Sequence, residues 1–131
     1  MTFVMDASIT ASWCFPDEES PAADRAFARI AEERAVVPAH WWFELRNVLL
    51  VGVRRRRVDG RQIGRFLGVL RELGIDEDRR PDEVAAFDLA RRHGLTFYDA
   101  AYLELALRHG AIATLDAALV TAATAEGATV V

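Results

Sequence analysis

Apolar and polar positions along this chain fall into two kinds of segment. Short apolar runs, such as Phe3-Val4-Met5 and Ala35-Val36-Val37, are typical of buried strands. Longer segments repeat apolar residues at helical spacing, as Ala23, Ala26 and Ile30 do. We therefore predict strands over residues 2–5, 35–37, 74–76, 111–115 and 128–131. Helices are predicted over residues 7–14, 22–30, 41–57, 59–73, 81–93, 96–108 and 116–125.

Several helix boundaries carry recognisable signals. Ser20-Pro21 places a capping residue before a proline in the first helical turn, and the segment from Asp59 to Gln62 resembles a capping box. The helix over 41–57 is apolar nearly all round until Val53, which predicts deep burial. In the helix over 81–93, the residues expected to pack against the rest of the molecule are Val84, Phe87, Leu89 and Ala90.

Strands alternate with helices along the whole chain, and this order predicts an α/β fold with a small, mostly parallel sheet covered by helices. A length of 131 residues suits one domain, 1–131. In open α/β sheets, ligands bind beyond the carboxyl ends of the strands. Residues that follow predicted strands are therefore the first candidates for chemistry.

Composition removes several function classes. All 16 basic residues are arginine, so Schiff-base chemistry and lysine-dependent phosphate loops are excluded. A net charge of −4 argues against nucleic-acid binding by bulk positive charge. Cys14 is the only cysteine, which leaves no internal disulfide and no cysteine-based zinc site. No signal peptide or membrane-spanning run is recognisable, so we expect a cytoplasmic protein with no membrane partner.

Four carboxylates occupy suggestive positions. Asp6 and Asp116 each follow a predicted strand, while Glu44 and Asp99 interrupt apolar helical segments. Taken singly, each aspartate could cap a helix, and Glu44 could face solvent or pair with an arginine. Taken together, the four could converge on one point, where their mutual repulsion favours a bound divalent cation. Oxygen-only ligands favour Mg²⁺, with Mn²⁺ as a possible substitute.

Four ordered motifs resemble those of the PIN domain family, and most closely the VapC type of toxin ribonuclease. They are Val4-Met5-Asp6-Ala7-Ser8, the segment from Phe43 to Leu49, the segment from Tyr98 to Ala106, and Ala113-Thr114-Leu115-Asp116. Each motif is weak alone, but the ordered set is fairly specific and spans essentially the whole chain. The resemblance implies a three-layer α/β/α domain whose parallel sheet has the strand order 3-2-1-4-5.

The resemblance also implies roles for individual residues. Asp6, Glu44, Asp99 and Asp116 become the catalytic acids, and Asp6, Asp99 and Asp116 the metal ligands. Ser8, Asn47 and Thr114 match accessory polar positions. Glu104 lies in the third motif but projects about 140° away from Asp99 on a helix, so we interpret it as structural or surface-exposed.

The implied activity is Mg²⁺-dependent endoribonuclease action, in which a metal-activated water cleaves RNA phosphodiester bonds. A VapC-type protein would be the toxin of a VapBC-type toxin–antitoxin system. Its cognate antitoxin would insert an arginine into an acidic, arginine-free pocket, and the toxin would form a homodimer. The tryptophan-bearing helix and the helix after Asp59 are candidate contact surfaces.

The run from Arg54 to Arg57 has two open interpretations. Cations at a helix C-terminus complement the helix dipole, so a solvated structural role is the default. Contact with RNA or with a partner is the alternative, because arginine suits phosphate recognition. The histidines are scattered and are interpreted as non-catalytic, and Trp41 and Trp42 as core or interface anchors.

Two other functions compete with the nuclease. A catalytically inactive PIN-like fold could bind RNA or a protein, with its acids serving as caps. An Asp at a strand end could instead be a phosphoryl-transfer nucleophile, but a receiver would need a lysine, and a haloacid-type phosphatase would need an Asp where Ser8 stands.

Overall fold

A five-stranded, all-parallel sheet forms the centre of the computed structural model, which describes all 131 residues. The strands lie in the order β3-β2-β1-β4-β5. They are β1 (Thr2–Met5), β2 (Arg34–Pro38), β3 (Ile75–Asp78), β4 (Ala111–Ala113) and β5 (Thr129–Val130). Val4 lies opposite Val36 on one side and Ile112 on the other. Both the α/β class and the strand order are confirmed.

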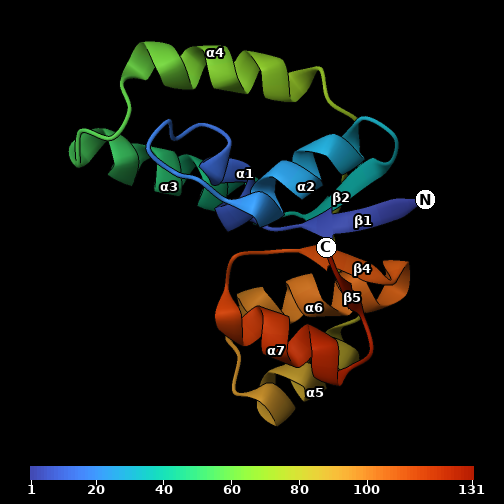
Figure 1. Ribbon diagram of the computed structural model, residues 1–131. Helices are drawn as coiled ribbons and strands as arrows, with labels where there is room; N and C mark the ends of the chain where they lie inside the picture. The colour runs from blue at the N-terminus through green and yellow to red at the C-terminus, as the bar shows by residue number, and fades with distance from the viewer.

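Helices cover both faces of the sheet and make the fold three-layered. Figure 1 shows α1 to α4 on one side of the sheet and α5 to α7 on the other. The helices are α1 (Ala7–Ser12), α2 (Pro21–Ile30), α3 (Trp41–Arg54), α4 (Gly60–Arg71), α5 (Glu83–His93), α6 (Phe97–His109) and α7 (Ala117–Ala125). Because β1 lies between these layers, Phe3, Val4 and Met5 are fully buried. None of the helices has the length and apolar character needed to cross a membrane.

Every helix except α3 has a side-chain cap at its N-terminus. The residue before each of these helices accepts a hydrogen bond from a backbone N–H three positions on, and these capping residues are Asp6, Ser20, Asp59, Asp82, Thr96 and Asp116. The predicted capping box between Asp59 and Gln62 is present in full. Asp6 and Asp116 therefore do cap helices, and capping fixes where their side chains lie.

The burial predicted for two helices is partly wrong. In α3, Trp41, Leu45 and Leu49 are buried, but Trp42 is 46% exposed and Phe43 71% exposed. In α5, Leu89 is buried, whereas Val84 is 80% and Phe87 53% exposed. Only one face of each helix contacts the core, so the additional apolar residues of the pattern lie at the surface.

The end of α3 differs from the sequence prediction because the helix ends at Arg54, not Arg57. Arg56 adopts a left-handed conformation with φ of 58°. The Arg56 N–H donates to the Val53 carbonyl and the Arg57 N–H to the Gly52 carbonyl, which is the Schellman arrangement. The chain therefore turns sharply after Arg55 and leads into α4.

Gly52 allows a close approach of the loop that follows α1. A Cβ atom at Gly52 would lie 2.5 Å from Cε1 and 2.8 Å from Cζ of Phe15, a buried residue of that loop. Contacts this short do not occur between real side chains. The ring of Phe15 can therefore occupy its position only because Gly52 has no side chain.

We expect Gly52→Ala to lower the free energy of unfolding, measured by urea denaturation. Overpacking against Phe15 costs about 1–3 kcal/mol, and the improved helix propensity returns only about 0.5–1 kcal/mol. The matched control is Gly64→Ala in α4, where a new methyl group meets nothing within 4 Å; this variant should gain stability. Equal gains in both variants would show that Phe15 does not require Gly52.

Candidate active site

The four predicted acids, which come from well-separated segments, line one pocket at the carboxyl edge of the sheet. Asp6 follows β1, Glu44 lies in the first turn of α3, Asp99 lies in the first turn of α6, and Asp116 precedes α7. The pocket has a volume of about 440 Å³. Its other lining residues are Ala7, Ser8, Ala11, Phe15, Glu18, Val48, Arg57, Tyr102 and Leu115.

Asp6 is the buried member of the set and is held by a network of hydrogen bonds. Its Oδ1 accepts from the Ser8 hydroxyl at 2.6 Å and from the Ile9 N–H at 3.0 Å. Its Oδ2 accepts from the Thr114 hydroxyl. Burial raises the pKa of Asp6 above its usual value, and these hydrogen bonds oppose the rise. Asp6 is thereby fixed in one orientation.

Ser8 and Thr114 connect Asp6 to the loop that carries Asp116. The Ser8 hydroxyl accepts the Leu115 N–H at 3.1 Å, and the Thr114 hydroxyl accepts the Asp116 N–H at 3.0 Å. Each hydroxyl donates to Asp6 and accepts from the backbone after β4, so the two carboxylate-bearing loops are joined directly. The structure thus places Ser8 and Thr114 beside the acids.

Glu44 is positioned by a residue that the sequence reasoning did not single out. The buried Tyr102 of α6 donates a hydrogen bond of 2.8 Å from its hydroxyl to Glu44 Oε1. His40 Nε2 lies 3.5 Å from the same oxygen and has no hydrogen-bond partner. Burial raises the pKa of Glu44 and lowers the pKa of His40. The spacing of three residues between Asp99 and Tyr102 puts both on one side of α6, and this could have pointed to Tyr102.

Asp99 shows most clearly that the acids act on one another. Its pKa is raised first by burial and then by the negative charges of Asp116 and Asp6. Its backbone N–H donates to the Thr96 hydroxyl at 3.1 Å, so that Thr96 caps α6. The carboxylate itself caps nothing and faces the pocket.

The donor set suits a hard divalent cation. An ionised carboxylate offers about four lone-pair sites, and Asp6 uses three of them in its hydrogen bonds. No three His, Cys, Asp or Glu side chains stand in an arrangement that would by itself hold an ion. Mg²⁺ is usually held by one or two carboxylates, with water and substrate phosphates as its other ligands. The pocket therefore fits Mg²⁺ better than a metal that needs a closed protein cage.

Other predicted residues lie elsewhere. Asn47 is on the exposed side of α3 and does not line the pocket. Glu104 is buried and pairs with Arg108 through two hydrogen bonds of 2.7 and 2.9 Å. Of the two roles considered for Glu104, surface exposure is wrong and a structural role agrees with this contact.

The expectation of an arginine-free pocket is wrong. Arg57 lines the pocket, where it pairs with Glu18 at 2.9 Å and with Asp17 at 3.2 Å. Its guanidinium lies 4.1 Å above the ring of Phe15. The sequence separation of about 40 residues between these partners explains why no local pattern indicated the contact.

Comparison with known proteins finds similarity to a family model, to a sequence relative and to a solved structure. The family model of the PIN domain matches residues 3–129. Ribonuclease VapC3 from Pyrobaculum aerophilum is 33% identical over 120 residues, which cover 88% of this chain and 90% of the relative. The crystal structure of PAE2754 from the same organism superposes with a TM-score of 0.73 at 23% identity, and the match covers 99% of this chain and 89% of that one. The last match supports the fold.

We expect Asp99→Asn to raise the thermal unfolding midpoint of the metal-free protein at pH 7. Because the pKa of Asp99 is raised, the folded state binds this proton more tightly than the unfolded state. The bound proton of Asp99 therefore stabilises the folded state at acid pH, and this stabilisation is lost as the pH rises through the raised pKa. The advantage of the variant should therefore disappear below the usual carboxylate range. The measurement is calorimetry in chelator across pH.

Glu32→Gln is the control for this comparison. It removes the same charge from an exposed residue with no ion pair and should leave the midpoint unchanged. A midpoint for Asp99→Asn at or below that of the parent at pH 7 would contradict the electrostatic interpretation.

Proposed function

Because this chain belongs to the PIN domain family, we propose that it is a metal-dependent endoribonuclease of the VapC type. The observation that carries the proposal is the convergence of Asp6, Glu44, Asp99 and Asp116 on one pocket. The similarity to Ribonuclease VapC3 supports RNA as the substrate.

The proposed cofactor is Mg²⁺, with Mn²⁺ as a substitute, held by Asp6, Asp99 and Asp116. When bound, such an ion lowers the pKa of a coordinated water and neutralises charge on the scissile phosphate. The pKa of Asp99 is raised by burial and then by the negative charges of Asp116 and Asp6. The repulsive part of this rise supports the assignment, since a cation among these carboxylates would relieve it.

The residues of the chain would orient the reaction. Ser8 and Thr114 fix Asp6 toward the pocket. Tyr102 holds one oxygen of Glu44, which leaves the other oxygen to accept a hydrogen bond from the attacking water. In-line attack on the phosphorus would give a 5′-phosphate and a 3′-hydroxyl.

The alternative is a catalytically inactive module that binds RNA or a protein. It is favoured by the capping roles of Asp6 and Asp116, which give those residues a structural purpose. Glu44 and Asp99 cap no helix, yet both are partly buried with raised pKa values. Two partly buried carboxylates that cap no helix and have raised pKa values favour the enzyme.

We propose further that the protein is the toxin of a VapBC-type system, acts on RNA in the cytoplasm, and forms a homodimer that a cognate antitoxin inhibits. The proposal is supported by the similarity to Ribonuclease VapC3 and by exposed apolar side chains on α3 and α5, among them Trp42, Phe43 and Phe87. Because Arg57 already lines the pocket and pairs with Asp17 and Glu18, an inserted antitoxin arginine would be a second cation beside the four acids.

Asp99→Asn should lower the rate of RNA cleavage by about 100-fold or more, because it removes a charge from the proposed metal site. Cleavage of labelled RNA by the parent should require Mg²⁺ and stop in chelator. Glu32→Gln should cleave at the parent rate. Undiminished cleavage by Asp99→Asn, or by the parent in chelator, would favour the binding module instead.

Light scattering of the purified chain should give twice its mass of 14.6 kDa. Addition of the small protein encoded beside it should then suppress RNA cleavage. A monomer that cleaves RNA at the same rate with and without that protein would contradict the proposed assembly while leaving the nuclease intact.

A further inference from the structure

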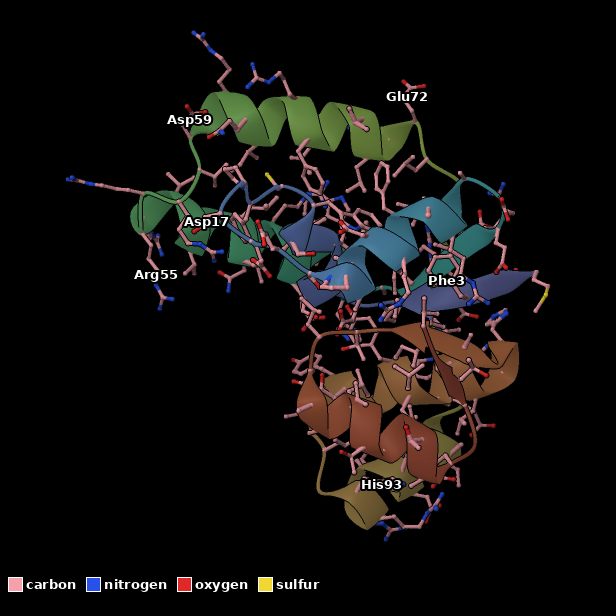
Figure 2. All side chains as sticks on the ribbon, viewed as in Figure 1. Phe3, Asp17, Arg55, Asp59, Glu72 and His93 are labelled. Atoms are coloured by element: carbon pink, nitrogen blue, oxygen red, sulfur yellow. The ribbon has the colours of Figure 1, made fainter.

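The arginine run after α3 divides into two parts with different surroundings. Arg54, Arg55 and Arg56 are exposed, and no carboxylate lies within salt-bridge distance of any of them. Figure 2 shows the side chain of Arg55 pointing away from the end of α3. Three adjacent cations without partners stand out in a chain whose net charge is −4.

Arg57 connects this turn to the acidic pocket. It is the only basic residue that lines the pocket, and with Arg56 it also lines a neighbouring hollow of about 390 Å³ between the end of α3 and the start of α4. Asp17, Glu18 and the ring of Phe15 hold its guanidinium in place. A polymer that leaves the acidic pocket on this side would pass Arg57 and reach the free arginines.

The conformation of Arg56 favours a functional role for the turn. The left-handed position after a helix normally belongs to glycine, because other residues are strained there. In this chain the residue at that position is Arg56, with φ of 58°. Residues retained in a strained conformation concentrate at functional sites. Here the strained residue is one of the unpaired cations.

We propose that Arg54, Arg55 and Arg56 bind the phosphate backbone of the RNA substrate next to the scissile bond, and that Arg57 guides the strand between this turn and the acidic pocket. The inference rests on the proposed nuclease function. An acidic pocket repels the rest of a polyanion, so cations at its edge are needed to keep the strand in place. Arginine binds phosphate oxygens in a bidentate manner.

Arg57 lines both the acidic pocket and the neighbouring hollow, and this continuity favours RNA over an acidic protein segment as the occupant. The phosphates that flank a scissile bond must leave the pocket over its rim, so an RNA strand bound for cleavage connects the two sites, and the free cations of the turn match its phosphates. Contacts with phosphate also predict a specific dependence on salt, because each neutralised phosphate of a single strand contributes about −0.7 to the slope of log K against log salt.

The test measures RNA binding without cleavage, in an Asp99→Asn background, by fluorescence anisotropy of a short single-stranded RNA over a range of salt concentrations. The combined change of Arg54, Arg55 and Arg56 to Gln should weaken binding by at least about 10-fold at low salt and reduce the slope by about 2. The control changes Arg25, Arg80 and Arg91 to Gln, which are exposed, unpaired and remote from the pocket lining. It should bind like the parent.

Arg56→Gly separates binding from folding. Glycine relieves the left-handed strain, so the thermal unfolding midpoint should rise or stay unchanged while RNA affinity falls. A purely structural role for Arg56 would not lower RNA affinity in a protein that is equally stable. This single change keeps the test decisive should the triple variant fold poorly.

The outcomes distinguish this inference from the proposed function. If the parent cleaves and binds RNA but the triple variant behaves like the control, the arginine turn is not an RNA contact and the nuclease proposal stands. Equal losses in the triple variant and its control would mean that only bulk charge matters and would overturn the inference. Unchanged RNA binding with lost affinity for the neighbouring encoded protein would assign the turn to that partner. A parent that neither binds nor cleaves RNA would overturn both proposals.

Discussion

The burial of the Asp6 carboxylate at the end of the central strand is the constraint on which the rest of the site depends. A carboxylate cannot be buried without partners at acceptable cost. Its three hydrogen bonds come from Ser8, Ile9 and Thr114 and so join β1, α1 and the end of β4. The Asp6 carbonyl also accepts from the Thr10 hydroxyl, which in turn accepts from the Trp41 indole of α3. The hydrogen bonds made by Asp6 and its neighbour Thr10 therefore hold β1, α1, α3 and the end of β4 in place around the pocket.

The other acids are arranged so that their repulsion persists in the folded protein. Asp6 and Asp116 cap helices and also contribute negative charge to the pocket. The Glu44 carboxylate is held by the Tyr102 hydroxyl, and both Glu44 and Asp99 are partly buried, which raises their pKa values. Such an arrangement sacrifices some stability for a preorganised field, as is common at functional sites. Arg57, held by Asp17 and Glu18, places one fixed cation at the edge of this field.

Some of these features could be predicted from the sequence and others could not. Asp6 and Asp116 could be located because each follows a strand and precedes a helix, and both signals are local. The strand order came from the family resemblance, since periodicity alone does not order strands. Periodicity shows which residues share a helix face but not how wide a face is covered, so the exposure of Phe43 and Val84 was missed. The pairing of Arg57 with Glu18 depends on a tertiary approach through Gly52 and Phe15, which no spacing within one segment reports.

The central claim is that the four acids form a cation site. Diffraction from crystals soaked with Mn²⁺, recorded for its anomalous signal, tests it most directly. We expect one peak in the acidic pocket, within bonding distance of a carboxylate oxygen of Asp6 and of Asp99 or Asp116, and no peak in Asp99→Asn crystals soaked in the same way. A pocket without a peak in parent protein that cleaves RNA, or a peak bound by other residues, would contradict the account.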